Sequence, residues 1–416
     1  MARDEIITGL DIGSTSIRVV SGQFKSGREG EESVHIIGAA EAPSEGISKG
    51  AITSIEDAVS SISSALEKCE RMTGIPIEHA MVSVNGAHVI AQDSQGVVAV
   101  SKANGEVGED DVERAIEAAQ SVATPPNYEI LHVIPRSFTV DDQTGIKDPV
   151  GMTGIKLEVD AQIVLGLTSQ IKNITKSVYR TGVDIDDLVI EVLAASESVL
   201  TKQQKELGVA LVNMGGSTTS LMVFEEGDVI HTKILPVGSG HITNDIAIGL
   251  RTSVDIAEEV KKQFGTALAA EVPKREEIDL ANIDANEQVR VSRKEVAEII
   301  EARLEEVFDM IRTELRKIDR DAKLPAGIIF TGGGAKLEGL IEAAKGYFRM
   351  SSSVGAPRHF QTPIDKIEDT TFATAIGLVL WGYGLTTGFN RPGLNNLSSV
   401  AGVTGRMGKW LKSLIP

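Results

Sequence analysis

Three short turns in the sequence combine glycine with small polar side chains, a composition typical of loops that bind phosphate. They are Asp11–Thr15 (DIGST), Asn213–Thr219 (NMGGSTT) and Thr331–Gly334 (TGGG). Glycine allows backbone N–H groups to approach phosphate oxygens closely, and serine and threonine hydroxyls add further donors without bulk. A single turn of this kind is more often a plain hairpin turn. Three of them, in this order and at this spacing, indicate a phosphate-binding site.

Other catalytic chemistries find little support in the sequence. The seven histidines show no metal-ligand spacing, and no order of Ser, His and Asp can be singled out as a nucleophilic triad. The turn GSTS lacks the lysine of a P-loop, and TGGGAK does not supply the full Gly-x4-Gly-Lys-Ser/Thr pattern. The sequence therefore argues against a Walker-type enzyme.

The first two turns lie in segments that resemble each other. Ile6–Ser21 reads IITGLDIGSTSIRVVS, and Val209–Phe224 reads VALVNMGGSTTSLMVF. Each segment is a β-rich run, a tight turn and a second β-rich run, which predicts a β-hairpin. The two segments lie about half a chain apart, so we infer duplication of a domain.

Helical periodicity alternates with short apolar strands along the rest of the chain, which predicts mixed α/β domains. Two segments interrupt this pattern. Residues 84–164 contain a predicted helix at Glu109–Val122 and several strand-like runs, and we interpret them as an inserted α+β subdomain. Residues 242–322 are rich in charge and helix, including the amphipathic stretch Arg293–Ile318, and form a second predicted insertion.

Composition limits the classes of function. A chain of 416 residues with 42% apolar residues predicts about two to four compact units. The net charge of -18 argues against non-specific nucleic-acid binding, because a phosphate polyanion requires a basic face. The single cysteine, Cys69, continues an apolar helical stripe, which predicts a core position in a reducing compartment. We predict neither a signal peptide nor a membrane-spanning helix.

The end of the chain has a different character. Residues 387–404 are rich in Gly, Asn and Ser, which predicts a flexible linker. In residues 405–416 (GRMGKWLKSLIP) the apolar side chains recur at helical spacing and leave the cations for the other face. Such a helix would lie on an anionic membrane; the alternative is a helix docked on the protein itself. The apolar residues are Met407, Trp410, Leu411, Leu414 and Ile415, and the cations are Arg406, Lys409 and Lys412.

The order of five motifs resembles the phosphate, connecting and adenosine motifs of actin, MreB and the DnaK-type chaperones, over nearly the whole chain to about residue 386. These motifs are LDIGSTS, EVLAASESVL, VNMGGSTTS, IIFTGGGAKLEGL and TFATAIGLVLWG. The resemblance implies an α/β chain with the duplicated actin-like (ribonuclease H-like) fold and two inserted small subdomains. It also implies binding of ATP and Mg²⁺ between the halves.

The resemblance assigns roles by position. Asp11 would face the hydration shell of Mg²⁺, so no protein atom would bind the metal directly. Glu191 matches the position that orients the attacking water in several members, and these two residues are the implied catalytic ones; the alternative for Glu191 is a surface carboxylate. The implied nucleotide-binding residues are Asp11, Gly13, Ser14, Thr15, Asn213, Gly215, Gly216, Ser217, Thr218, Gly238, Glu258, Lys261, Gly332, Gly333 and Gly334.

One position departs from the pattern. Many ATPases of the superfamily have Asp where this chain has Asn213, and a neutral amide supports a metal-bound water less well than a carboxylate does. The expectation is ATP binding with slow or no hydrolysis.

Within this superfamily the chain resembles the bacterial FtsA family, through VGSGHITNDIAIGL, GVDIDDLVIEVLAASESVL and the place of the first insertion. The nearest alternatives are a soluble pilus scaffold of the PilM kind and an ATPase enzyme of the sugar-kinase or chaperone kind.

The FtsA resemblance also implies subdomain boundaries. These are residues 1–83 for the first part of subdomain 1A, 84–164 for inserted 1C, 165–200 and 370–386 for the rest of 1A, 201–241 and 323–369 for 2A, 242–322 for 2B, 387–404 for the linker and 405–416 for a membrane-targeting helix.

The FtsA resemblance implies a cell division protein on the cytoplasmic side of the inner membrane at the septum. It would assemble with itself into filaments and tether filaments of the tubulin-like protein FtsZ to the membrane. Subdomain 1C would recruit later division proteins. Arg303 matches the arginine that family members use to bind the acidic FtsZ tail, and Lys294 is a second implied contact; a solvated helix charge is the alternative for both.

Overall fold

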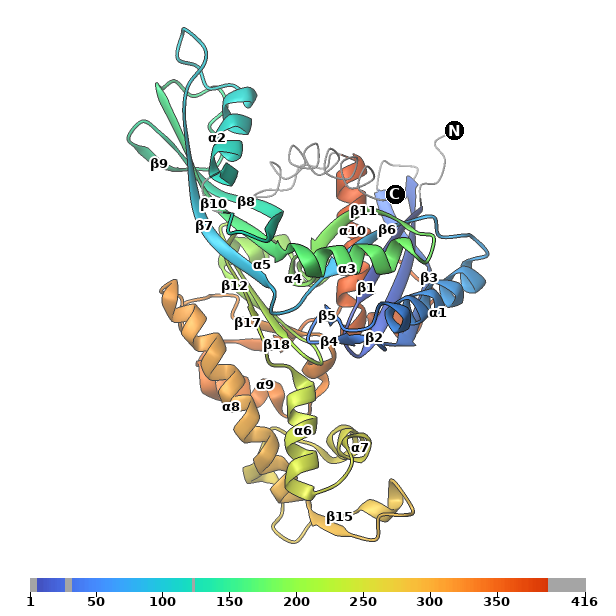
Figure 1. The fold of residues 1–416 in the computed structure, drawn as a ribbon. Coiled ribbons are helices and arrows are strands. Elements are labelled where there is room, and N and C mark those ends of the chain that lie inside the picture. Colours follow the sequence, from blue (N-terminus) through green and yellow to red (C-terminus); the bar gives the residue numbers. More distant parts are fainter. Residues whose placement is uncertain (1–5, 27–31, 122–123, 388–416) are drawn as a thin grey trace.

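The computed structural model describes residues 6–26, 32–121 and 124–387 (Figure 1). The predicted membrane segment 405–416 and all but the first residue of the predicted linker lie outside the described residues. Among the described helices, none combines the length and apolar character needed to cross a bilayer.

The first half of the molecule is built on a five-stranded sheet with the strand order β11-β6-β1-β2-β3. The predicted hairpin is present, because β1 pairs antiparallel with β2 on either side of the first glycine turn. Strand β3 continues the meander, whereas β6 and β11 run parallel to β1 on the other side. The strands are β1 (Ile6–Ile12), β2 (Ser16–Ser26), β3 (Glu32–Pro43), β6 (His79–Val84) and β11 (Asp184–Ile190).

The second half repeats this sheet strand for strand, with the order β14-β13-β12-β17-β18. Its first three strands again form an antiparallel meander, and the last two again run parallel to the first. The duplication inferred from the two similar segments is therefore confirmed. The strands are β12 (Val209–Met214), β13 (Thr219–Glu225), β14 (Asp228–Leu235), β17 (Ile328–Thr331) and β18 (Ser352–Val354).

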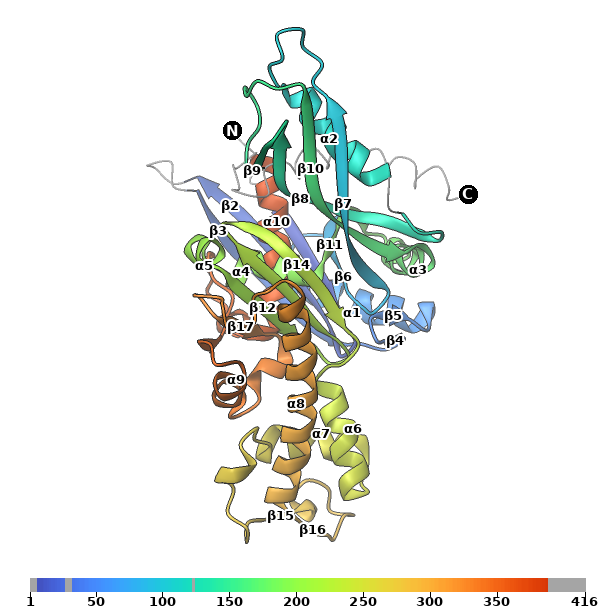
Figure 2. The ribbon, with the colours of Figure 1, turned by 90° about the vertical axis from the view of Figure 1, so that its left-hand side faces the viewer.

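Helices cover both faces of the first sheet (Figure 2). Helix α1 (Ile55–Thr73) packs on β2 and β3 and against α3 (Thr168–Tyr179), while α4 (Glu191–Val199) and α10 (Ala373–Thr387) lie on the opposite face. Helix α4 also contacts β12 and β13, so it joins the two sheets. Short α5 (Lys202–Leu207) then leads into the second half, where α9 (Leu340–Phe348) packs on β18.

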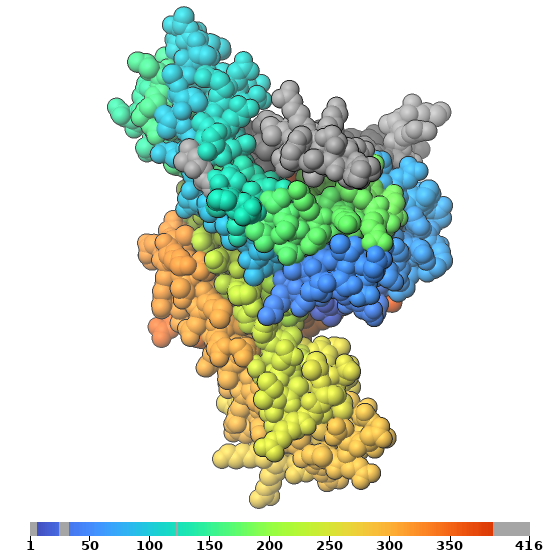
Figure 3. All heavy atoms as spheres, viewed as in Figure 1, coloured from blue at the N-terminus to red at the C-terminus, as the bar shows by residue number. Residues whose placement is uncertain are grey.

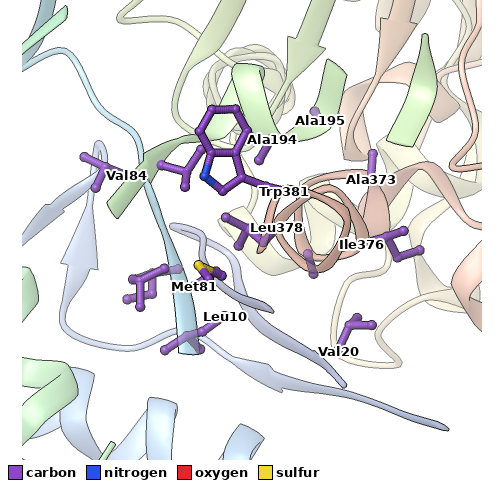
Figure 4. Packing of buried hydrophobic residues seen from close by; sticks show 14 of the residues in the cluster. Leu10, Val20, Met81, Val84, Ala194, Ala195, Ala373, Ile376, Leu378 and Trp381 are labelled. Atoms are coloured by element: carbon purple, nitrogen blue, oxygen red, sulfur yellow. The ribbon is translucent and has the colours of Figure 1, made fainter. Parts of the chain in front are cut away.

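The crossing of α4 and α10 is the closest helix contact of the first half. A Cβ atom added to Gly377 would lie 1.8 Å from the carbonyl oxygen of Ala194. Ser198 of α4 donates a hydrogen bond of 2.6 Å to the carbonyl of Ala373, at the start of α10. Around this crossing the buried side chains of Leu10, Met81 and Trp381 pack together (Figure 4). The last described helix thereby returns to the first half and completes its core.

The first insertion forms a separate lobe (Figure 3). Its four-stranded sheet has the order β7-β10-β8-β9, and the predicted helix α2 packs on β7 and β10 over its own apolar core. Lys147, just after β9, pairs with Asp228 at the start of β14 and so connects the insertion to the second half. The elements are β7 (Val89–Ala99), α2 (Glu109–Ser121), β8 (Tyr128–Val140), β9 (Gln143–Ile146) and β10 (Lys156–Leu167).

The second insertion is mainly helical and lies between β14 and β17 of the second half. The predicted amphipathic helix is α8 (Arg293–Lys317), which buries Val296, Ile300 and Leu304 against the rest of the lobe. The other elements are α6 (Ser239–Leu250), α7 (Val254–Phe264), β15 (Glu277–Asp279) and β16 (Arg290–Ser292). In the first half the corresponding place, after β3, holds only the two-residue strands β4 (Ile47–Ser48) and β5 (Ala51–Ile52) and helix α1.

The α4–α10 contact predicts an asymmetry between two helical glycines. Gly377→Ala places a methyl group on the Ala194 carbonyl, so we expect a loss of about 3 kcal/mol in the free energy of unfolding. Gly346→Ala in α9 meets nothing within 4 Å, and its better helix propensity should stabilise the protein by about 0.5–1 kcal/mol. Urea denaturation followed by circular dichroism compares the two variants. Equal effects would contradict this description of the crossing.

Candidate functional site

The first two glycine turns, one from each half, face each other at contact distance. The β1–β2 turn is closed by a hydrogen bond of 3.2 Å from Gly13 N to Ser16 O, and the β12–β13 turn by one of 2.9 Å from Gly215 N to Thr218 O. A Cβ atom added to Gly216 would lie only 2.3 Å from the Thr15 hydroxyl oxygen. The two hairpins therefore meet tip to tip between the halves.

Both turns leave backbone donors unused. Within the described part of the chain, no hydrogen bond engages the N–H groups of Ser14, Thr15, Gly216 or Ser217. These are the two central residues of each turn, so the arrangement is the same in both halves. Because unpaired N–H groups that lose water are costly, a concave pair of such turns is suited to an anion with many acceptor oxygens, such as a phosphate chain.

The N-terminus of α6 donates hydrogen bonds to the backbone of the second turn. Ser239 N and Gly240 N donate to the carbonyls of Gly215 and Gly216 at 2.9 and 2.8 Å. A Cβ atom on Gly238, the residue before the helix, would lie 2.6 Å from the Gly215 carbonyl. Only glycine fits at this position, so Gly238 allows the helix to pack directly on the second turn.

Two carboxyl groups are buried behind the turns. Asp11, at the end of β1, accepts a hydrogen bond of 2.8 Å from the Ser83 hydroxyl, and burial raises its pKa. Glu191 is the first residue of α4 and is only 7% exposed, so it is not a surface carboxylate. Burial, reinforced by the negative charge of Asp11, raises the pKa of Glu191 to about 8. At neutral pH this glutamate is mainly protonated.

Asn213, at the end of β12, binds Glu191 directly. Its side-chain nitrogen donates to Glu191 Oε1 at 2.6 Å and to the Thr374 hydroxyl at 3.3 Å. An aspartate here would place a second carboxyl group against Glu191 in a buried place, where the two groups could not both ionise without strong repulsion. The amide that distinguishes this chain from many ATPases of the superfamily is thus a structural partner of Glu191.

The third glycine turn packs on the end of the same strand. Gly332 has a left-handed backbone with φ of 83°, and a Cβ there would lie 2.3 Å from Asn213 Oδ1. Gly334 lies against the Met214 side chain, with 2.4 Å to an added Cβ, whereas Gly333 is exposed. The turn follows β17, which pairs with β12, so the sheet itself brings this turn to the site.

A cleft of about 320 Å³ opens beside the second turn. Gly216, Ser217 and Glu258 are among the residues that line it. Glu258, on α7, accepts hydrogen bonds from Lys261 Nζ at 2.6 Å and from the Thr243 hydroxyl. Lys261 is largely buried and also donates to Thr243 at 2.8 Å, so its charge is already compensated within the protein.

Sequence reasoning missed several residues that support the site. Ser83 donates to Asp11, and Asn85 donates to the carbonyl of Ile12 at 3.3 Å. Ser83 lies near the end of β6 and Asn85 directly after it, so these two polar residues at the end of an apolar run were the signal available. His132 of β8 accepts a hydrogen bond of 3.1 Å from Ile190 N, immediately before Glu191. Nothing local in the sequence indicates this last contact.

The implied partner residues lie elsewhere, on α8. The Arg303 guanidinium binds both oxygens of Asp245 on α6, at 2.6 and 3.0 Å, and also contacts Glu306. Its side chain remains 26% exposed. Lys294 is half-buried in the first turn of the same helix. The implied membrane residues lie beyond the described part of the chain.

Comparison with solved structures defines the class of the fold. The chain is similar to a structure titled PilM-PilN type IV pilus biogenesis complex, with a TM-score of 0.67 and 15% identity over 90% of this chain and 98% of that one. It is also similar to MreB5 of Spiroplasma citri bound to ADP, with a TM-score of 0.52 and 12% identity over 92% and 97%. The protein therefore has the actin-like ATPase fold.

Sequence comparison identifies the family. The family model for cell division protein FtsA matches residues 210–377, and the model for the SHS2 domain inserted in FtsA matches residues 86–165. Cell division protein FtsA of Pseudomonas aeruginosa is 34% identical over 98% of both chains, and that of Bacillus subtilis is 37% identical over 94% of this chain and 88% of its own. The chain belongs to the FtsA family of cell division proteins.

The buried Glu191 predicts a pH-dependent stability difference. The unfolded chain loses this proton near pH 4.5 and the folded chain near pH 8, so ionisation destabilises the fold as pH rises through that window. Glu191→Gln keeps an oxygen acceptor for Asn213 and has no proton that titrates between these pH values. As the pH rises, the free energy of unfolding of this variant should therefore increase relative to that of the wild type, by up to about 1.4 kcal/mol for each pH unit.

Urea denaturation at several pH values from 5 to 8 measures this difference. The matched control is Glu113→Gln on the exposed face of α2, which should show no such trend. A stability difference between Glu191→Gln and the wild type that does not change with pH would contradict the assignment.

Proposed function

We propose that this protein binds ATP with Mg²⁺ between its two halves and uses the bound state to assemble as a membrane adaptor in cell division. The observation that carries the proposal is the pair of facing turns with four unused N–H groups, beside a cleft and above two buried carboxyl groups. Structures of MreB5 of Spiroplasma citri, which has a similar fold, were solved with bound ADP and with bound AMPPNP, and they support the proposal of a nucleotide site.

Each part of the site has a defined task in this proposal. The N–H groups of Ser14, Thr15, Gly216 and Ser217 donate to phosphate oxygens. Asp11 would accept hydrogen bonds from the hydration shell of Mg²⁺, and the cation would neutralise phosphate charge. Glu258, which lines the cleft beside the second turn, would offer carboxylate oxygens to ribose hydroxyls, and the third glycine turn would lie beside the adenosine.

The protonation state of Glu191 favours a nucleotide-dependent switch over an enzyme with fast turnover. A residue that orients an attacking water must accept its proton, and a protonated glutamic acid is a poor acceptor. With a pKa of about 8, Glu191 is mainly protonated at neutral pH, and its Oε1 atom already accepts the hydrogen bond from Asn213. Turnover is accordingly slow in this proposal, and the bound nucleotide persists long enough to hold the halves together.

Isothermal titration calorimetry with MgATP tests the nucleotide site. The wild type should bind ATP, and Gly216→Val should lose binding, because its side chain would occupy the space against Thr15. Gly346→Val introduces the same side chain into open space on α9 and should leave binding unchanged. If the wild type takes up neither ATP nor ADP, the proposed function is wrong.

The adaptor role rests on family membership and on two further features. The acidic FtsZ tail would bind subdomain 2B at Arg303, and the sequence-predicted helix of residues 405–416 would attach the chain to an anionic inner membrane at the septum. Filaments of the protein itself would add avidity to an anchor that is weak alone. Subdomain 1C, which we assign to residues 84–164, would present a surface to later division proteins.

The Asp245 contact makes the FtsZ assignment testable. An acidic peptide must compete with Asp245, and also with Glu306, for the guanidinium of Arg303, whose side chain is 26% exposed. Removal of Asp245 should therefore strengthen peptide binding, whereas removal of Arg303 should abolish it. A merely structural ion pair would make both substitutions equivalent.

A vesicle sedimentation experiment tests membrane attachment and FtsZ-tail binding together. The full chain should carry a labelled FtsZ tail peptide to anionic vesicles in the presence of MgATP, and a chain that ends at residue 404 should carry none. Arg303→Ala should sediment without the peptide, whereas Asp245→Asn should sediment with at least as much peptide as the wild type. Vesicle binding by the shortened chain would favour a different anchor, and loss of peptide in both point variants would contradict direct recognition by Arg303. A chain that never sediments would favour a soluble scaffold of the PilM kind.

A further inference from the structure

A small hairpin in the first half borders the cleft beside the second turn. Strands β4 and β5 are joined by Lys49 and Gly50, whose φ angles of 52° and 74° are both left-handed. This is the geometry of a two-residue type I′ turn, which matches the twist of a tight hairpin. Non-glycine residues seldom adopt this conformation, so the turn holds the Lys49 backbone in a conformation that costs energy. The hairpin lies between α1 and the lobe of α6 and α7 (Figure 1).

The turn is fixed to the first phosphate turn. Gly50 N donates a hydrogen bond of 3.1 Å to the hydroxyl of Ser14. A Cβ atom on Gly50 would lie 2.4 Å from the Cα atom of Gly86 and 2.6 Å from Asn85 Oδ1. Asn85 in turn binds the carbonyl of Ile12, at the end of β1. The backbone of Lys49 is therefore positioned by the same residues that position the first turn.

Lys49 lines the cleft together with the second phosphate turn. The 320 Å³ cleft has Lys49 on the side of the first half and Gly216 and Ser217 on the side of the second. Among the described residues that line it, Lys49 is the only lysine or arginine, and Asp255 and Glu258 are acidic. Lys261 lies nearby but is already paired with Glu258. The Lys49 side chain is exposed, and none of the ion pairs recorded among the described residues includes it.

We propose that Lys49 is a phosphate-binding residue, whose ammonium group contacts the phosphate chain of the nucleotide from the first half. This inference rests on the proposed ATP site and deepens it. A triphosphate brings several negative charges to a cleft whose other charged groups are carboxyls, and Mg²⁺ compensates only part of them. A cation on a rigid turn provides the remaining charge with little loss of backbone freedom on binding. Nucleotide binding would also draw the hairpin of the first half toward the second half.

Titrations with MgATP, ADP and adenosine distinguish phosphate binding by Lys49 from a structural role of Lys49 in the cleft. If Lys49 binds phosphate, its removal should weaken MgATP and ADP binding but not adenosine binding. If Lys49 instead keeps the shape of the cleft by pairing with Asp255 or Glu258, its removal should weaken all three ligands alike. Asparagine is the appropriate replacement because it accepts left-handed backbone angles and carries no charge.

The experiment measures affinities of the full chain for MgATP, ADP and adenosine by calorimetry, with adenosine at high concentration. We expect Lys49→Asn to weaken MgATP binding by about tenfold or more, which is the usual effect of losing one charge-assisted hydrogen bond. Lys49→Arg should restore most of the affinity. Lys274→Asn, an exposed lysine in a turn of the second insertion, is the matched control and should bind like the wild type.

The outcomes distinguish the two levels of the proposal. Failure of the wild type to bind any nucleotide overturns the proposed function itself. Wild-type binding together with undiminished MgATP affinity in Lys49→Asn overturns only the role of Lys49. An equal loss for adenosine and MgATP, with circular dichroism unchanged, also overturns it. A loss of charge dependence in the variant, seen as a weaker effect of salt on MgATP affinity, would support it further.

Discussion

The structure depends on the close approach of two backbone turns that come from duplicated halves of the chain. Gly216 and Thr15 meet at a distance that admits no side chain on the glycine, so the halves can close only as far as these tips allow. The hydrogen bonds within each turn use the outer residues and leave the inner N–H groups without partners in the described structure. Those donors are costly when unpaired, and an anion between the tips satisfies donors from both halves at once. In the proposed function, closure of the halves and ligand binding are therefore the same event.

Burial and charge together determine the protonation of the groups behind the turns. The chain has a net charge of -18, and the carboxyl groups of Asp11 and Glu191 are buried behind the turns, where burial raises the pKa of both. Asn213 accommodates this arrangement because its amide donates a hydrogen bond to Glu191 without adding charge. An aspartate would supply more help to a metal-bound water but would face another carboxyl group at hydrogen-bond distance. In the proposed function, this neutral side chain favours lasting nucleotide binding over rapid hydrolysis.

The two insertions extend the molecule in opposite directions from this centre (Figure 3) and remain connected to it. Helix α6 holds the second turn at its N-terminus and is tied further along to α8 through Asp245 and Arg303. In the first insertion, His132 of β8 binds the backbone just before Glu191 and contacts the Trp381 ring of α10. Both insertions are thus linked to the centre of the molecule by direct contacts between helices and strands.

The sequence by itself determined the local structure of this protein. The two hairpins, the glycine turns and the amphipathic helices α2 and α8 all follow from spacing and residue type within short windows, which is why the duplication was predictable. The tertiary structure decided which distant residues meet. Glu191 and Asn213, Ser83 and Asp11, Arg303 and Asp245, and Lys49 and the second turn are separated by 22 to more than 100 residues. Their burial and charge state depend on how two sheets and two insertions pack, and no local pattern encodes that packing.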